Sequence, residues 1–326
     1  MLRLLSLSLR QLIPRGGRSL GIFLLGASLL TGGCGARPEG PLPVFCSPDS
    51  PRMQEALAGL KAGLAPRSLE VVCVPEFGSE ADEALKKIRS QRPSLLLVLG
   101  SPALIRVTPV EKVTPVVFAV VANPYVTGAA DSPEHPDIHQ KNVTGIASPP
   151  PVGPALEQGA HLLGAGTWGM LYDPGVGQEV EVAELFTRLA PTYGLTPLTG
   201  TSTGAATDLA ALRQLLSRGA QVLYLPPTAS AGRYAAALLA WGRERQVRVV
   251  SSQAEGSHQG ALLWVALDYQ TLGKEAAHLA KRILAGENPE KIPITQDTPL
   301  KVETDESLIR HWSGYPGVPR IPGGGR

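Results

Sequence analysis

Several short apolar runs in the first half of this chain end in residues whose side chains form hydrogen bonds. These residues are Ser47, Asp49, Ser101 and Asn123, each at or just behind the end of its run. Where a helix begins, as we expect at both serines, backbone N–H groups and a hydroxyl can together hold a carboxylate or another anion. Alternatively, the serines only cap their helices. Asn123, whose amide both donates and accepts, could likewise only shape the turn before Pro124.

The second half of the chain repeats this arrangement behind three later apolar runs. Tyr172 and Asp173 end one run, Thr228 follows another, and Asp268 follows the last at an expected hinge. The rings of Tyr172 and Tyr224 could lie against an apolar group, although a tyrosine that ends a strand is also typical of half-buried packing. Eight residues are therefore predicted to contact a ligand: Ser47, Asp49, Ser101, Asn123, Tyr172, Asp173, Thr228 and Asp268.

The elements that position these residues follow from the apolar patterns. Continuous apolar runs, such as 94–99 and 116–121, indicate strands buried on both faces, as in a parallel sheet. Residues 53–64 have helical spacing, with Ser50 or Asp49 as the cap and Pro51 in the first turn. The expected strands are 43–46, 69–74, 94–99, 116–121, 142–146, 168–172, 196–199, 221–225, 247–251 and 260–266, and the expected helices are 53–64, 81–90, 152–163, 178–193, 206–216, 229–245 and 272–284.

Strands that alternate with helices build a parallel sheet with right-handed crossovers. The alternation pauses at the polar segment 131–141 and then starts again. The sequence therefore predicts an α/β protein of two doubly wound, Rossmann-like lobes joined by a multi-strand hinge. Ligands of such sheets bind at the carboxyl ends of the strands, so we expect a cleft between two lobes that can hinge and close.

The first 34 residues have the pattern of an export signal. Four arginines precede a short apolar run, 20–30, which leads through small residues into Cys34. The run is shorter than the roughly 20 apolar residues of a membrane-spanning helix. We therefore expect residues 1–33 to be a lipoprotein signal peptide, Cys34 to be the lipid-modified first residue, and 34–40 to be a tether. The alternative is an ordinary signal peptide in which the cysteine is accidental.

Composition and motifs exclude several other classes of function. The 326 residues carry a formal net charge of +2 without a block of like charges, whereas nucleic-acid binding requires a concentrated basic face. His135 and His139 have the spacing of two metal ligands on a helix, but Pro133 and Pro136 disfavour a helix there, and we predict no metal site. No nucleophile elbow, Walker loop or dinucleotide fingerprint is present, so we predict neither catalysis nor a cofactor.

Besides Cys34, the chain contains only Cys46 and Cys73, each in or beside an expected strand. An exported location would permit a disulfide between neighbouring strands. We favour two buried free thiols, because adjacent parallel strands seldom place cysteines at bridging geometry.

Two sets of motifs resemble the ABC-transporter substrate-binding lipoprotein family that includes tryptophan- and tyrosine-binding members. Residues 114–124, followed by Asn-Val-Thr-Gly at 142–145, are similar to its central "PIVF-A-V-x-DP" and "NVTG" pattern. The motifs at 260–262, 268–273 and 283–289 match its "GAL…DY..LG…ILxGExP" signature. The resemblance covers most of residues 43–322. It implies the type I periplasmic-binding fold, with three crossings between the lobes.

The resemblance also implies the domain boundaries and the partners. The N-terminal lobe would take 41–145 and about 262–287, and the C-terminal lobe 146–261 and about 288–326. The protein would capture a small polar or amphipathic solute outside the cytoplasmic membrane and deliver it to an ABC permease. Asn123 and Thr228 stand where the family usually carries aspartate. An amino acid ligand needs an anionic partner for its ammonium group; Asp268, Asp173 and Asp49 remain available, but the case for an aromatic amino acid is weakened. The alternative is a ligand-sensing or scaffolding envelope lipoprotein without a transport partner.

Overall fold

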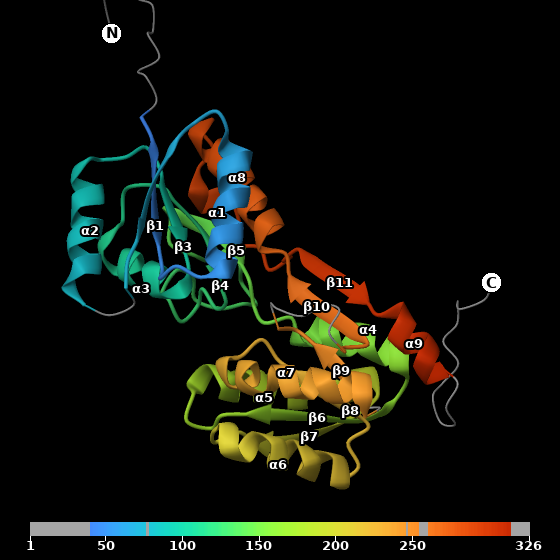
Figure 1. Ribbon diagram of the computed structural model, residues 1–326. Coiled ribbons are helices and arrows are strands. Elements are labelled where there is room, and N and C mark those ends of the chain that lie inside the picture. Colours follow the sequence, from blue (N-terminus) through green and yellow to red (C-terminus); the bar gives the residue numbers. More distant parts are fainter. Residues whose placement is uncertain (1–39, 76–77, 246, 254–259, 314–326) are drawn as a thin grey trace, which may run out of the picture. The chain divides into compact units, whose positions relative to one another are not determined.

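The framework of the protein is a pair of β-sheets. The computed structural model describes residues 40–75, 78–245, 247–253 and 260–313 (Figure 1). Within these residues, the first sheet contains five parallel strands in the order β2-β1-β3-β4-β5. Its strands are β1 (Leu42–Cys46), β2 (Leu69–Cys73), β3 (Leu96–Leu99), β4 (Val116–Val121) and β5 (Val143–Ala147). Cys34 and the expected signal lie outside the described residues.

The second sheet has six strands in the described part of the chain, in the order β11-β10-β9-β8-β6-β7. All neighbours pair in parallel except β10 and β11, which are antiparallel. Its strands are β6 (Gly166–Tyr172), β7 (Leu195–Thr201), β8 (Val222–Leu225), β9 (Arg248–Ser251), β10 (Leu263–Leu267) and β11 (Leu300–Thr304).

Helices cover both faces of each sheet. The first sheet and its helices form what we call the first lobe, and the second sheet and its helices form the second lobe. The helices of the first lobe are α1 (Pro51–Leu64), α2 (Ser79–Ser90), α3 (Ser101–Val110) and α8 (Tyr269–Leu284). The helices of the second lobe are α4 (Val152–Leu163), α5 (Gly177–Leu189), α6 (Ala205–Ser217), α7 (Ala229–Glu244) and α9 (Glu306–Ser313), and two short 3₁₀ turns lie at Ala190–Tyr193 and Pro289–Lys291.

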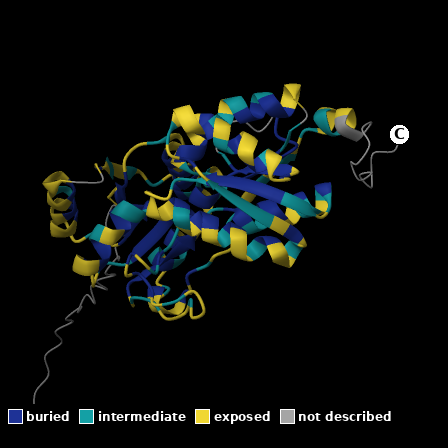
Figure 2. Cartoon of the chain, turned by 90° about the horizontal axis from the view of Figure 1, so that it is seen from below, coloured by how far each residue is buried: buried dark blue, intermediate teal, exposed yellow. Residues whose placement is uncertain are grey.

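Each sheet separates the hydrophobic core of its lobe into two clusters, one on each face of the sheet. Val44 packs into the cluster with α1 and α8, whereas its neighbour Phe45 packs into the cluster with α2 and α3. In the second lobe, Met170 faces the α4 and α5 side and Leu171 the α6 and α7 side. Successive side chains of a strand point to opposite faces, so a doubly covered strand such as β1 or β3 is buried along its whole length (Figure 2) and has a continuous apolar sequence. This confirms the predicted α/β class of doubly wound sheets.

Within the described residues, the chain passes between the two lobes at three places. It leaves the first sheet after β5, returns between β10 and α8, and leaves again between residue 298 and β11. The Thr298 hydroxyl donates to the Ala147 carbonyl (2.8 Å) beside the last passage. Three crossings agree with the expectation from the resemblance.

Two expected lobe boundaries differ from the sheet pairing. We expected residues from about 262 to join the first lobe, but β10 pairs with β9 and β11 in the second sheet. We also expected residues from about 288 to join the second lobe, but Ile292 and Ile294 pack into the clusters of the first lobe. The passages therefore lie near 268 and 298. No helix in the described part of the chain is both long and apolar enough to span a membrane.

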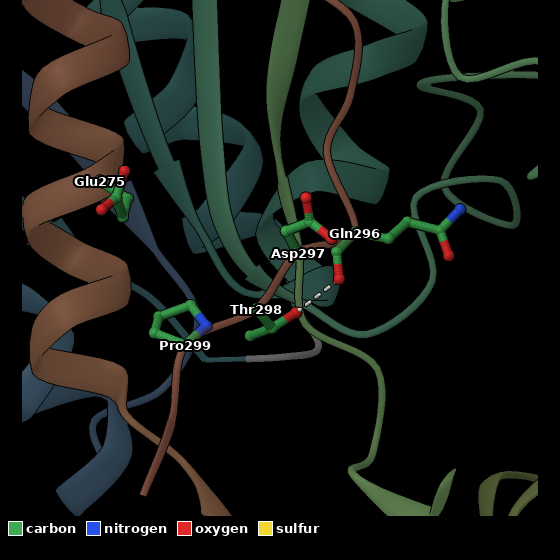
Figure 3. A pocket seen from close by; sticks show the side chains of 5 residues that line it. All are labelled: Glu275, Gln296, Asp297, Thr298 and Pro299. Atoms are coloured by element: carbon green, nitrogen blue, oxygen red, sulfur yellow. Dashed lines mark hydrogen bonds between the residues drawn. The ribbon is translucent and has the colours of Figure 1, made fainter. Parts of the chain in front are cut away.

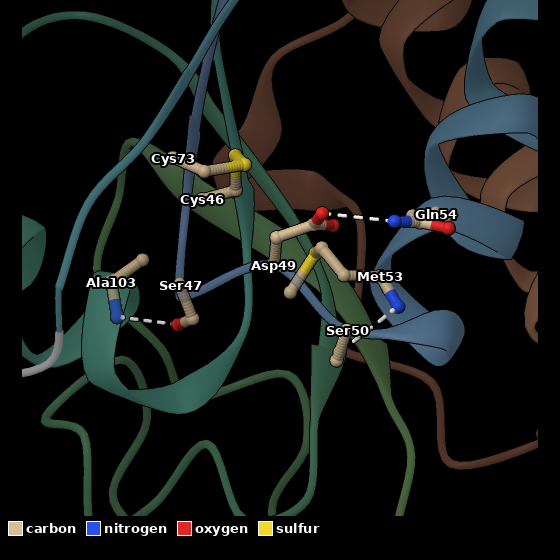
Figure 4. The surroundings of a disulfide bond; sticks show 8 residues. All are labelled: Cys46, Ser47, Asp49, Ser50, Met53, Gln54, Cys73 and Ala103. Atoms are coloured by element: carbon tan, nitrogen blue, oxygen red, sulfur yellow. Dashed lines mark hydrogen bonds between the residues drawn. A yellow bond between two sulfur atoms is a disulfide. The ribbon is translucent and has the colours of Figure 1, made fainter.

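Cys46 and Cys73 form a disulfide bond (Figure 4), so the expectation of free thiols was wrong. The physical reason is the register of β1 and β2, which sets these last residues of the two strands directly opposite each other. Their Cα atoms are 4.4 Å apart, a separation that a disulfide can bridge.

Candidate ligand-binding site

Ser47 occupies the turn behind β1, and its hydroxyl reaches a helix far along the sequence (Figure 4). The Oγ atom accepts a hydrogen bond of 3.1 Å from the backbone N–H of Ala103, in the first turn of α3. Gly100, which precedes α3, has a φ of +97° and no side chain that could cap the helix. Ser47 is 7% exposed. It therefore caps α3 from a neighbouring strand, and its hydroxyl hydrogen has no acceptor among the residues that the structure describes.

The expectation that a helix begins at Ser47 needs correction. Helix α1 begins at Pro51, and its cap is Ser50, which accepts the N–H of Met53 at 3.4 Å. Ser101, in contrast, is the first residue of α3, as predicted, and is half-buried. The structure thus brings Ser47 and Ser101 to the N-terminus of one helix, where the helix dipole and the two hydroxyls favour an anion.

Asp49 and Asn123 are partly used by the turns in which they lie. Asp49 is exposed and accepts a hydrogen bond of 2.8 Å from the side-chain amide of Gln54, in α1. The Asn123 Oδ1 atom accepts the N–H groups of Tyr125 (3.0 Å) and Val126 (3.4 Å) behind β4. Asn123 therefore shapes this turn, while its Nδ2 group makes no hydrogen bond to the described residues and can still donate to a ligand.

Tyr172 and Tyr224, considered together from the sequence, lie in different surroundings. Tyr172 ends β6 and is half-buried against the core of the second lobe. Tyr224 is buried, stacks on Phe186 with ring centroids 5.9 Å apart, and donates to the Ser252 hydroxyl at 3.0 Å. Burial raises the pKa of Tyr224, an effect that the Ser252 bond only partly offsets. Tyr224 is a core residue, so only Tyr172 remains a candidate for ligand contact.

Asp173 and Thr228 follow the adjacent strands β6 and β8. The Asp173 Oδ1 atom accepts the N–H of Gly175 at 2.9 Å, and the carboxylate is half-exposed. Thr228 caps α7 by accepting the N–H of Ala231 at 3.3 Å. Both residues therefore stand at the carboxyl edge of the second sheet, as predicted, and each also stabilises its own turn.

Asp268 lies at the passage between β10 and α8, at the hinge position expected from the sequence. It caps α8, because it accepts both the N–H (3.0 Å) and the hydroxyl (2.8 Å) of Thr271, and Lys301 lies 3.8 Å away. Burial alone would raise the pKa of Asp268, but these hydrogen bonds and the ammonium group of Lys301 hold that pKa below its ordinary value. Its carboxylate therefore already has partners within the chain.

Sequence reasoning missed two buried carboxylates at this edge of the second sheet, those of Glu179 and Asp208. Glu179, the third residue of α5, is 2% exposed and accepts hydrogen bonds from Asp173 and Ser230. The only signal in the sequence is an acidic residue in the first turn of a helix, which is common on exposed surfaces. Their partners became visible only in the folded chain.

Two hollows lie elsewhere. One, of about 480 Å³, is lined by Glu275 and the segment Gln296–Pro299 at the third passage (Figure 3). The other, of about 490 Å³, includes Arg89 and Glu111, at the amino-terminal ends of β3 and β4. None of the eight predicted contacts lines either hollow. Among the described residues, no group of three or more His, Cys, Asp or Glu residues could hold a metal ion.

Comparison with known proteins identifies the family to which the chain belongs. A family model described as "ABC transporter substrate binding protein" matches residues 44–304. A search of the curated proteins finds no match.

Three solved structures of substrate-binding and transport proteins are similar to the chain. One is an ABC domain in complex with L-Trp from Streptococcus pneumoniae (18% identity; 86% of this chain and 96% of that one; TM-score 0.61). Another is a ligand-free, open substrate-binding protein with adhesive properties from Clostridium difficile (18%; 87% and 97%; TM-score 0.68). The third is a periplasmic ribose ABC transporter protein from Conexibacter woesei (17%; 85% and 96%; TM-score 0.60).

At these identities the structural likeness shows the fold, which is the type I periplasmic-binding fold expected from the sequence. The family match adds membership, because it extends over most of the chain and includes both sheets. The chain belongs to the family of ABC transporter substrate-binding proteins.

Proposed function

We propose that the protein captures a small polar or amphipathic solute outside the cytoplasmic membrane and delivers it to an ABC permease. Family membership implies a small-molecule ligand and a membrane permease. The observation that carries the proposal is the N-terminus of α3, where the hydroxyl of Ser47, which caps the Ala103 N–H, and Ser101, the first residue of the helix, lie at the carboxyl edge of the first sheet. Tyr172, Asp173 and Thr228 occupy the matching edge of the second sheet.

The chemistry of these residues supports a solute that is rich in hydrogen-bonding groups. The α3 N-terminus and the Asn123 amide supply donors, Asp173 supplies an acceptor, and the Tyr172 ring supplies an apolar surface. One similar structure holds L-Trp, and another is described as a ribose transporter protein. Amino-acid-like solutes and sugars are therefore the classes to be tested first.

The proposed mechanism is closure of the lobes about the three passages. A solute that contacts both lobes favours the closed state by its differential affinity for that state. A permease can then distinguish loaded from empty protein. We propose no catalytic step.

We further propose that Cys34 carries the lipid that holds the protein at the cell envelope. The arginine-rich leader and the short apolar run before Cys34 support this. One acyl chain binds a membrane only marginally, so stable retention requires more than one chain on this cysteine. Labelling with a radioactive fatty acid should mark the wild-type chain but not the Cys34→Ala variant.

A thermal-shift screen tests the solute-binding role. Residues from Gly40 onward form a compact unit of their own, so a soluble fragment that begins at Gly35 suits the screen. It would be screened against L-tryptophan, other amino acids, D-ribose, other sugars, nucleosides, small peptides and inorganic anions. A solute at a hundredfold excess over its Kd adds about 2.7 kcal/mol to the folded state, which corresponds to a rise in melting temperature of several degrees.

Absence of any shift across these classes would contradict the capture of a small solute. A bound solute that fails to stimulate ATP hydrolysis by any co-expressed ABC permease would instead favour the sensing or scaffolding alternative.

A further inference from the structure

Glu179 is a buried carboxylate whose three hydrogen-bond donors come from two different loops. Its side chain is 2% exposed. Oε2 accepts the backbone N–H of Asp173 (2.8 Å) and the hydroxyl of Ser230, and Oε1 accepts the backbone N–H of Ser230 (2.9 Å). None of these donors is a lysine or arginine. The negative charge is thus held by N–H groups and one hydroxyl, two of the donors lying in the first turn of α7.

The two loops are those that carry the proposed ligand contacts of the second lobe. Asp173 and Tyr172 stand at the end of β6, and Ser230 lies two residues after Thr228, behind β8. Strands β6 and β8 are neighbours in the sheet. Glu179 itself belongs to α5, the helix that follows the first of these loops. One side chain therefore ties the loop after β6 to the start of α7, and Glu179 reaches Ser230 across 51 residues of sequence.

We propose that Glu179 is a positioning residue, which fixes the β6 and β8 loops relative to each other so that Tyr172, Asp173 and Thr228 can contact one solute. This inference rests on the proposed function for the solute, but the fixing of the loops can be measured without any solute. Glu179 also uses the N–H and the hydroxyl of Ser230 at the start of α7, where an anion would otherwise be favoured. The half-exposed carboxylate of Asp173 then remains for contact with a solute.

Glu179→Gln is the sharpest test, because it keeps the size of the side chain. A carboxamide has one accepting oxygen, so in either orientation its NH₂ group faces a backbone N–H, of Asp173 or of Ser230. Glu111→Gln is the control for the loss of a buried carboxylate elsewhere in the chain. Glu111 is a buried glutamate whose Oε1 accepts the backbone N–H groups of Val113 and Thr114 and whose Oε2 pairs with Arg89, and it lies before β4, at the opposite edge of the first sheet.

Amide hydrogen exchange gives the first measurement. We expect Glu179→Gln to speed exchange by about tenfold or more at Asp173 or at Ser230, whichever amide faces the NH₂ group, because that amide loses its buried hydrogen bond, while Glu111→Gln leaves both amides unchanged. Equal protection in wild type and Glu179→Gln would overturn the proposal, whether or not a solute is known.

Calorimetric titration gives the second measurement, with L-tryptophan and D-ribose as probes. For a probe that binds wild type, we expect about a tenfold higher Kd in Glu179→Gln and an unchanged Kd in Glu111→Gln. Equal losses in both variants would show a general effect of stability and overturn the positioning role. If neither probe binds wild type, L-tryptophan and D-ribose are excluded as ligands of the proposed function. Hydrogen exchange alone then decides the inference about Glu179.

A rescue experiment separates positioning from simple packing. Glu179→Ala removes four heavy atoms, which acetate matches in number and charge. We expect acetate, but not chloride at equal ionic strength, to restore the slow exchange of Asp173 and Ser230 in Glu179→Ala. Rescue by both salts, or by neither, would contradict a role that depends on the carboxylate.

Discussion

The cap that Ser47 gives to α3 should be worth more than an ordinary surface cap. Ser47→Ala leaves the N–H of Ala103 without its partner, and Ala103 is 1% exposed, so water cannot easily replace the hydroxyl. A buried donor left unsatisfied costs about 1–3 kcal/mol, against about 1 kcal/mol for a typical exposed cap. We expect a loss of about 2 kcal/mol in the free energy of unfolding.

Substitution of Gly100 tests the hydrogen bond between Ser47 and Ala103 independently. A Cβ atom at Gly100 would lie 2.3 Å from the Ser47 Oγ and 2.6 Å from its Cβ, at a φ of +97°. Gly100→Ala therefore adds backbone strain of about 1–2 kcal/mol and pushes the hydroxyl away from Ala103. Ser47→Gly removes both clashing atoms. In the double variant the hydrogen bond is lost only once, so the two losses should fall short of additivity by about 2 kcal/mol.

Urea unfolding followed by circular dichroism measures the free energy of unfolding of the four proteins in this cycle, which are wild type, Gly100→Ala, Ser47→Gly and the double variant. The matched control is Ser50→Ala, which removes a half-buried cap whose bond to Met53 is longer, at 3.4 Å, and should cost less than Ser47→Ala. Additivity within about 0.5 kcal/mol, or equal losses in Ser47→Ala and Ser50→Ala, would refute the tertiary cap.

Three further predictions concern the disulfide, the hinge and the site. Cysteines 27 residues apart close a loop whose entropy is worth about 3.5 kcal/mol, so Cys46→Ser/Cys73→Ser should lower the urea midpoint; an unchanged midpoint would contradict the bond. The pKa of Asp268 is lowered in the folded state. The ionised Asp268 carboxylate therefore stabilises the fold above the pKa of about 4 that it has in the unfolded chain, and this stabilisation is lost as the pH falls through the pKa of the folded state. Unfolding measured from pH 7 to pH 2 should therefore show a smaller acid-dependent loss in Asp268→Asn than in wild type, and equal losses would exclude this role. Ser101→Ala and Asn123→Ala should weaken binding of a solute found by the screen while leaving the melting temperature of the free protein nearly unchanged; unaltered affinity in both would remove the first lobe from the site.

The sequence alone predicted those features that depend on neighbouring residues. The continuous run at 94–99 indicated a strand buried on both faces, and Leu97 and Val98 indeed pack into opposite clusters of the first lobe. Ser50 and Pro51 marked the start of α1. The strand Leu300–Thr304 was missed, because its alternate residues are exposed and it is defined by its antiparallel pairing with β10.

The candidate site was predicted as a set of turns, but the use of each side chain was not. Ser47 and Asp268 were predicted as ligand contacts, and the structure shows both serving as helix caps. Tyr224 lies one residue before the end of β8, and its position in the sheet buries it against Phe186.

Local sequence thus determined which segments are strands and helices and which turns lie at strand ends, because periodicity and capping act over a few residues. Only the tertiary structure decided which of these segments meet. Ser47 reaches Ala103 across 56 residues, Glu179 reaches Ser230 across 51, and Cys46 reaches Cys73 across 27. Each meeting depends on the order and register of parallel strands, which are set by the packing of whole helices on both faces of a sheet.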